Sequence, residues 1–327
     1  MSVRAQLAVF LLGFIYTLLL VPLVKRLAVY CGALDKPNAR KVHHQPIPLW
    51  GGLGVAGGYF LATASVICLS QSFREAVTPS IISQLTGMTL GGLIILVVGM
   101  VDDRYGMPAK VKLALQLVTG LVMFYFGIKI DYITVPWYGV IFLSTWQSIL
   151  VTLFWIAGIT NALNLIDGLD GLLAGVSLTV ASVFFAVSLL KGQFVIALVM
   201  ACLAGCSLGF LRYNFNPAQI FMGDTGSLFF GLMFAGWSII GLLKSTATFA
   251  FLLPIFLMAV PIFDTTFAIL RRLLAHKPIF QADKGHLHHR LLSLGLNQRQ
   301  VVLIIYAINT AFGLCGLALF YWTCRGE

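Results

Sequence analysis

The chain has 327 residues, of which 59% are hydrophobic and only 10% are charged, and its formal net charge is +10. A soluble domain carries about a quarter charged residues, so this composition excludes a soluble globular protein. It indicates an integral membrane protein with a single domain over residues 1–327, because no polar block is long enough to fold separately.

Stretches of about 20 apolar residues predict ten transmembrane helices in an all-α, polytopic fold. The fifth is irregular, because Ile133–Phe142 is apolar too and Pro136 interrupts it. The first is too long for a signal-peptide core, so we expect it to stay as a span. The ten spans are expected near residues 5–24, 49–70, 81–101, 111–130, 141–164, 171–190, 193–211, 227–243, 247–270 and 300–322.

Lysines and arginines are distributed unequally over the connecting loops. One set of loops carries 15 of the 21 basic residues and the opposite set carries six. Both termini are then expected to face the outside, because positively charged loops stay in the cytoplasm. The net charge reflects this bias and suits anionic lipid head groups, and it does not indicate nucleic-acid binding. The predicted cytoplasmic loops are near 25–48, 102–110, 165–171, 212–226 and 271–299.

The first cytoplasmic loop, DKPNARKVHHQPIPLWGG from Asp35 to Gly52, is rich in proline and basic residues. Its charges could serve only as a topology signal. Alternatively, Arg40, Lys41 and His43 could face an anionic substrate. The residues alone favour neither interpretation.

Two adjacent carboxylates, Asp102 and Asp103, end the third predicted span in the motif VDDRYGMPAK. Neighbouring like charges repel each other and need a cation or a proton between them. A divalent ion or an acid–base pair would supply it. The pair therefore indicates function rather than a solvated loop.

The motif NALNLIDGLDG joins the fifth and sixth spans and carries Asn161, Asn164, Asp167 and Asp170. Folding does not require acids at this position. Carboxylates at the end of a membrane helix are costly if dehydrated, so they indicate a functional site.

The motif FNPAQIFMGDTGS places Asp224 between Gly223 and Gly226, just before the eighth span. Glycines permit close backbone approach, and exposed amides at a helix start can hold phosphate. Aspartate is also a good helix N-cap, which is the structural alternative for Asp224. Asp264, near the inner end of the ninth span, could be catalytic, but pairing with Arg271 or Arg272 is the slightly favoured interpretation.

All six of these acids reach the predicted cytoplasmic face, and this sorting is the strongest indication of one shared site. The loop after the ninth span adds a cationic cluster made of His286, His288 and His289 with Lys284 and Arg290. No cysteine or glutamate completes a zinc site there, so phosphate or sugar contact is the favoured interpretation.

Clustered carboxylates beside basic loops suggest Mg²⁺, or Mn²⁺, holding a phosphate-bearing substrate. Such an ion neutralises the charge that develops in phosphoryl transfer. Because the site lies at the membrane boundary, one substrate is expected to be a lipid and the other cytosolic. The residues therefore predict a metal-dependent enzyme acting on a lipid phosphate.

The motif order resembles that of the polyprenyl-phosphate N-acetylhexosamine-1-phosphate transferases. The resemblance covers Asp35 to Arg290, through DKPNxRKxHxxPxPxxGG, VDDRYGMPAK, NALNLIDGLDGL, FMGDTGS and HLHH. It implies transfer of a sugar 1-phosphate from a UDP-sugar to polyprenyl phosphate with release of UMP. Leu287 interrupts the histidines, as in the GlcNAc branch, which implies UDP-GlcNAc and undecaprenyl phosphate as substrates in a bacterial cytoplasmic membrane. The reaction would be the first membrane step of cell-envelope polysaccharide synthesis.

The resemblance also implies residue roles. Asp102, Asp103 and Asp224 are the expected catalytic acids, with Mg²⁺ on Asp224 and Asn164. Substrate binding is expected of Asn161, Asp167, Asp170, Arg40, Lys41, His43, His286, His288, His289 and Arg290.

Other interpretations stay open at this point. They are a phospho-MurNAc-pentapeptide transferase, a membrane prenyltransferase and a cation-coupled transporter, although no repeated halves support the last two. Direct attack by the lipid phosphate is preferred to a phospho-enzyme, because positioning and metal electrostatics account for most phosphoryl-transfer catalysis. A homodimer is compatible with the sequence.

Overall fold

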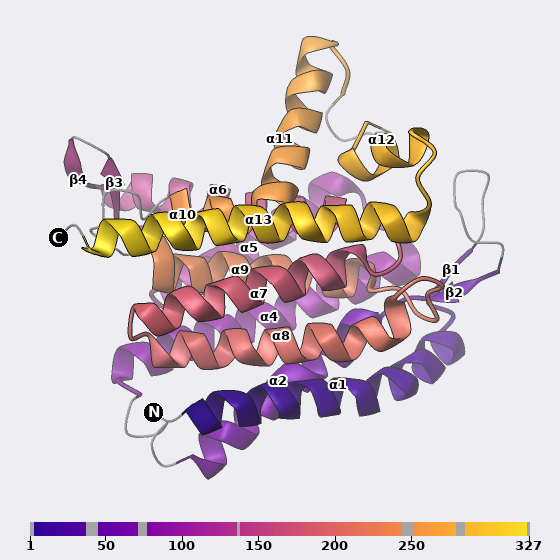
Figure 1. Cartoon of the computed structure of the whole chain (residues 1–327), viewed down its shortest axis with the longest axis horizontal. Helices are drawn as coiled ribbons and strands as arrows, with labels where there is room; N and C mark the ends of the chain where they lie inside the picture. The colour runs from indigo at the N-terminus through magenta and orange to yellow at the C-terminus, as the bar shows by residue number, and fades with distance from the viewer. Residues whose placement is uncertain are drawn as a thin grey trace.

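The computed structural model describes residues 3–36, 45–70, 77–135, 138–243, 252–278 and 285–325. Figure 1 shows long helices packed side by side, with both chain ends at one end of the bundle and the β1–β2 hairpin at the other. The elements are α1 (Val3–Cys31), β1 (Leu34–Asp35), β2 (Ile47–Pro48), α2 (Gly51–Leu69), α4 (Pro79–Tyr105), α5 (Ala109–Tyr125), β3 (Tyr132–Val135), β4 (Gly139–Phe142), α6 (Thr145–Ile166), α7 (Leu172–Leu190), α8 (Phe194–Asn214), α9 (Gly223–Ser238), a π-helical turn (Ile239–Leu243), α10 (Leu252–Leu257), α11 (Ala259–Leu274), α12 (Leu287–Ser293) and α13 (Gln298–Arg325).

Eight helices in the described part of the chain are long and apolar enough to cross a bilayer. They correspond to predicted spans one to three, five to eight and ten, with α9 continued by the π-helical turn. The prediction of an all-α, polytopic membrane protein is confirmed. The fourth predicted span is α5, which is shorter at 17 residues.

The predicted start of the fifth span at residue 141 is wrong. Residues on either side of Pro136 form an antiparallel hairpin instead, with Tyr132 opposite Phe142. Aromatic and β-branched residues favour this extended pairing. Helix α6 begins only at Thr145, where the Ser144 N–H donates to Gln147 Oε1 at 2.9 Å in a capping box.

The ninth predicted span, 247–270, is not one straight helix. Its described part breaks at Met258, between α10 and α11, and α11 leaves the bundle sideways (Figure 1). Pro261 explains the break, because it lacks the N–H that would bond the Leu257 carbonyl in a continuous helix. The side chain of Asn309, buried in α13, supplies a donor instead, with its Nδ2 3.4 Å from Leu257 O and 2.8 Å from Thr179 Oγ1.

We expect Asn309→Leu to destabilise the fold by about 1–3 kcal/mol, because the buried Leu257 carbonyl and the half-buried Thr179 hydroxyl would lose their donor. The melting temperature of the purified protein in detergent would measure this loss. Thr179→Val is the matched control, since it removes one acceptor and leaves the bond to Leu257, so its melting temperature should fall less. Equal melting temperatures for Asn309→Leu and the wild type would contradict this account of the break.

Helix α9 is the buried centre of the bundle. Glycines bring its neighbours into backbone contact. A Cβ on Gly231 of α9 would lie 2.5 Å from Thr160 Cα of α6, and a Cβ on Gly99 of α4 would collide with the backbone of Thr225. The ends of α4 and α6 therefore meet the start of α9, and these ends carry the predicted acids.

Candidate active site

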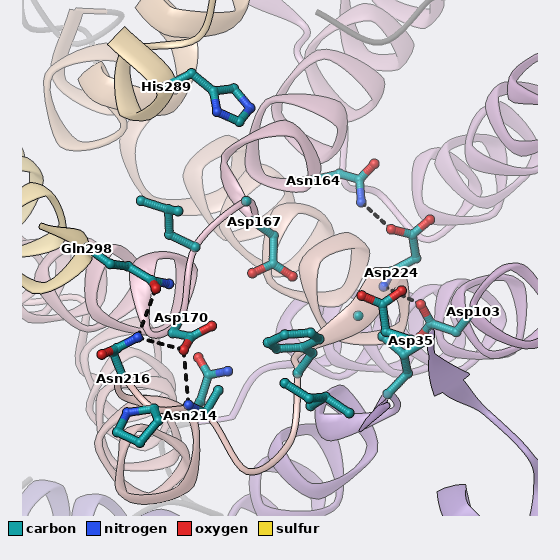
Figure 2. Close-up of a pocket in the computed structure, with 18 of the residues that line it drawn as sticks. Asp35, Asp103, Asn164, Asp167, Asp170, Asn214, Asn216, Asp224, His289 and Gln298 are labelled. Carbon is teal, nitrogen blue, oxygen red and sulfur yellow. Dashed lines mark hydrogen bonds between the residues drawn. The ribbon is translucent and has the colours of Figure 1, made fainter. Parts of the chain in front are cut away.

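A cavity of about 750 Å³ is lined by residues of β1 and β2, at the end of the bundle opposite the two termini (Figure 1), and Figure 2 shows its lining. Five of the six predicted acids line it, and Asp264 does not. Asp35 of β1 joins them, although the sequence analysis gave it no role. The acids of the lining are Asp35, Asp102, Asp103, Asp167, Asp170 and Asp224.

Asp103 of α4 holds the first turn of α9. Its Oδ1 accepts the Asp224 N–H at 2.7 Å, and its Oδ2 accepts the Thr225 N–H at 3.1 Å and the Thr225 hydroxyl at 2.6 Å. Anions are favoured at a helix N-terminus because its first amides lack partners. Gly223 permits the contact, because it has a positive φ of 70° and no Cβ. Asp224 lies inside the first turn, so the alternative that Asp224 is the N-cap is wrong.

Asp224 is bonded from two further helices. Asn164 Nδ2 of α6 donates to Asp224 Oδ1 at 2.7 Å and to Ser227 Oγ at 2.8 Å. Lys112 of α5 forms ion pairs with both Asp224 and Asp102. The sequence analysis counted Lys112 only as a topology charge, because the VDDRYGMPAK motif ends two residues earlier. Four helices thus meet around Asp224.

Asp167 follows the end of α6 and points into the cavity (Figure 2). Its carboxylate accepts no hydrogen bond from the described residues. Burial, reinforced by the negative charges of Asp224, Asp103 and Asp170, raises the pKa of the Asp167 carboxyl well above its usual range. This oxygen pair is therefore suited to bind a proton or a cation.

Asp170 holds the opposite wall of the cavity together. Its Oδ2 accepts the Asn216 amide at 2.9 Å and the Ala218 N–H at 3.0 Å. Asn216 also donates to Gln298 Oε1 of α13, and Asn214 accepts the Gly171 N–H. Sequence analysis missed the two asparagines, which flank Phe215 at the start of the FNPAQIFMGDTGS motif, because only its acid was weighed.

The three predicted histidines occupy different environments. Only His289 lines the cavity, whereas His286 and His288 are buried. His288 packs against Gly168 of the loop after α6, where a Cβ would lie 2.5 Å from its Nε2. Asp264 accepts hydrogen bonds from His286 and Leu287, so its predicted pairing with Arg271 or Arg272 is wrong.

Other predicted site residues lie away from the cavity or cannot be assessed. Asn161 exchanges hydrogen bonds with Gln116 of α5 and donates to Ala157 O, and it does not line the cavity. Arg290 is exposed in the last turn of α12 and is also absent from the lining. Arg40, Lys41 and His43 lie outside the residues that the structure describes.

Residues 285–293, which carry the three histidines, are called the histidine loop. We expect acid to destabilise the histidine loop through His288. Burial, with the neighbouring charge of His289, lowers the pKa of His288 to about 4. The unfolded chain then binds this proton first, so stability falls by up to about 3 kcal/mol as the pH drops from 6.5 to 4. Melting temperatures across this range should fall less steeply for His288→Gln than for wild type. His276→Gln, at an exposed position, is the control, and identical curves for all three proteins would refute the assignment.

The donor set of the cavity suits a hard cation. Among the described residues no three His, Cys, Asp or Glu side chains are grouped closely enough to hold a metal alone. Mg²⁺ does not need such a group, because it uses one or two carboxylates and takes water and substrate phosphate oxygens for the rest. Asp224, with Asn164 beside it, and Asp167 offer oxygens of this kind.

A second cavity, of about 490 Å³, lies between α6 and α11. Phe154, Trp155 and Ile159 line it from α6, and Ile262 and Ile269 line it from α11. None of its lining residues is charged, so it suits a hydrocarbon chain. Because Asn164 and Asp167 follow at the end of α6, the same helix joins the apolar and acidic cavities.

Comparison with known proteins agrees with this geometry. Residues 85–242 match the family described as Glycosyl transferase family 4. A probable undecaprenyl-phosphate N-acetylglucosaminyl 1-phosphate transferase of Bacillus subtilis (strain 168) is 42% identical over 95% of this chain and 84% of its own length. A decaprenyl-phosphate N-acetylglucosaminephosphotransferase of Mycobacterium tuberculosis (strain ATCC 25618 / H37Rv) is 39% identical over 86% of this chain and 74% of its own length.

A more distant relative, the undecaprenyl-phosphate alpha-N-acetylglucosaminyl 1-phosphate transferase of Escherichia coli (strain K12), is 28% identical over 89% of this chain and 78% of its own length. These relatives confirm the resemblance seen in the five motifs. The chain therefore belongs to glycosyl transferase family 4 and is a polytopic membrane phosphotransferase.

Proposed function

We propose that the chain transfers GlcNAc-1-phosphate from UDP-GlcNAc to undecaprenyl phosphate, forming undecaprenyl-diphospho-GlcNAc and UMP. The observation that carries the proposal is the convergence of carboxylates from four separate segments on one cavity at one end of a membrane bundle. The names of the relatives, which act on undecaprenyl or decaprenyl phosphate, support the same reaction.

Each of the two cavities receives a different part of the substrates. The prenyl chain occupies the apolar cavity between α6 and α11, and its phosphate reaches the acidic cavity along α6. The nucleotide sugar enters the acidic cavity from the cytoplasm. The basic bias of the loops on this side supports a cytoplasmic site, and the two chain ends at the other end of the bundle support an outward position for both termini in a bacterial cytoplasmic membrane.

The acids then take distinct roles. Both oxygens of Asp103 are engaged by α9, so we assign the proton of the lipid phosphate to Asp102, which lines the cavity beside Asp224 and pairs with Lys112. A lipid phosphate oxygen attacks the phosphorus that carries the sugar. The bond from that phosphorus to the bridging oxygen breaks, and UMP leaves with this oxygen. Lys112 holds Asp102 beside Asp224 during the transfer.

Asp224 and Asn164 would hold Mg²⁺, with Mn²⁺ as the alternative ion. When bound, the ion supplies positive charge where the diphosphate accumulates negative charge. Asp167, which points into the cavity, is placed to share this ion or to contact the substrate (Figure 2). Asp170 shapes the wall through the loop that it holds.

The test is UMP release by the purified protein with undecaprenyl phosphate and Mg²⁺. UDP-GlcNAc, UDP-GalNAc and UDP-MurNAc-pentapeptide are supplied in separate reactions. We expect lipid-dependent release with UDP-GlcNAc alone, and its loss when EDTA removes the metal. Release with the pentapeptide donor would place the chain in the other branch. No release with any donor, from protein that remains monodisperse, would refute the transferase proposal.

A further inference from the structure

Asp264 of α11 is joined to the start of α12 by both of its carboxylate oxygens. Its Oδ2 lies 2.9 Å from His286 Nδ1, and its Oδ1 accepts the Leu287 N–H at 2.8 Å. The side chains of Asp264 and His286 are nine-tenths buried. A buried carboxylate needs such partners, because a lone buried charge is costly.

Helix α11 projects from the bundle beside α12 (Figure 1), and the two bonds of Asp264 join the first half of α11 to the start of α12. A third bond runs from Arg271 Nη1 to Gly285 O at 3.0 Å, one residue before His286. The first residues of the histidine loop are thus attached to α11 and not to the acidic cavity.

The far side of α12 faces the cavity through His289 and Leu292. His286 and His288 stack with their ring centroids 5.9 Å apart, and the His288 and His289 rings are 4.3 Å apart. Of the three histidines, only His289 reaches the cavity lining. The three histidine rings therefore form a row that starts at Asp264 and ends at the acidic cavity.

We propose that Asp264 and His286 form a latch between α11 and α12 that positions His289 at the acidic cavity. Both are positioning residues, and His286 acts through its Nδ1 bond to Asp264, not through its Nε2. The inference rests on the transferase function proposed above, because it gives His286 a positioning role and leaves His289 to face the substrate of that reaction.

The two nitrogens of His286 allow a sharp test. An asparagine amide can occupy the place of Nδ1, whereas a glutamine amide reaches the place of Nε2. His286→Asn should therefore keep the latch, and His286→Gln should break it as Asp264→Ala does. If the latch is broken, we expect kcat/KM for UDP-GlcNAc to fall about 10²-fold, because displacing an active-site group such as His289 by about 1 Å lowers the rate by about this factor. KM for undecaprenyl phosphate should stay unchanged.

The double variant Asp264→Ala/His286→Gln should be no worse than Asp264→Ala alone, because Asp264→Ala already removes the bond to His286 together with the bond to Leu287. Asp131→Asn is the matched control. It removes a half-exposed carboxylate that pairs with Lys129 at the other end of the bundle, and its activity should equal that of the wild type. Loss of activity in His286→Asn equal to that in His286→Gln would show that Nε2 does the chemistry, and would overturn the latch.

Hydrogen–deuterium exchange gives a second readout that does not depend on activity. Asp264→Ala should speed the exchange of the Leu287–Ser293 amides and leave α9 unchanged. Unchanged exchange in α12 would overturn the latch even in an active enzyme, and faster exchange with full activity would show that it does not serve the reaction. If the wild type releases no UMP with any donor, the transferase function fails, while exchange still decides whether the latch exists.

Discussion

Replacement of Asp224 by asparagine should lower kcat for UMP release about 10³-fold, which corresponds to about 4 kcal/mol of lost transition-state stabilisation. The side chain keeps its size and can still accept the hydrogen bond from Asn164. What disappears is the negative charge at the point where α4, α5, α6 and α9 meet. Both the proposed metal ion and Lys112 depend on that charge.

The measurement is UMP release against Mg²⁺ concentration for Asp224→Asn and the wild type. We expect the variant to need more Mg²⁺ and to remain slow when Mg²⁺ is saturating. Asp131→Asn removes a carboxylate of the same kind at the opposite end of the bundle, so its curve should follow the wild type. A variant that regains the full rate at high Mg²⁺ would limit Asp224 to metal affinity, and an unimpaired variant would remove it from the site.

The convergence of the acids could be predicted because topology alone brings loop ends together. Hydrophobic length marks the spans, and the basic bias assigns the loops to one side. Acids placed in alternate loops must then share a face, as Asp103, Asp167 and Asp224 do in the acidic cavity. The motif resemblance adds the reaction, which the residues alone do not specify.

The particular bonds within the site could not be predicted, because they depend on how helices far apart in sequence rotate and pack. Lys112 is separated from Asp224 by 112 residues, and nothing near Lys112 marks it as the partner of Asp224. The pairing of Asp264 with His286 depends on the break at Met258. A hydropathy window does not detect that break, because Pro261 leaves the segment equally apolar.

The histidine motif shows the same limit. Three histidines at i, i+2 and i+3 predict one cationic cluster when only spacing is considered. The short helix α12 instead directs His286 toward α11, His288 toward Gly168 and His289 toward the cavity. The residue types were therefore informative about chemistry, while the division of roles required the packing of α12 between its neighbours.

Gly223→Ala should abolish most of the activity although it removes no charged group. A Cβ at this position would collide with the Asp103 carboxylate, and the residue has a φ of 70° that favours glycine. Asp103 must then move away and give up its bonds to Asp224 and Thr225. Because Asp224 would shift with the first turn of α9, we expect kcat to fall about 10²-fold.

The matched control for this variant is Gly192→Ala, in the turn between α7 and α8. Gly192 has a similar φ of 66°, but its Cβ would meet no atom within 4 Å. It should therefore lose about 1–2 kcal/mol of stability from backbone strain and keep its activity. UMP release and melting temperature, measured on both variants, separate the two effects. If Gly223→Ala loses only stability, as Gly192→Ala does, then the Asp103 contact does not position Asp224 for the reaction. A selective loss of kcat would show that the acidic cavity depends on the close approach of α4 to the start of α9.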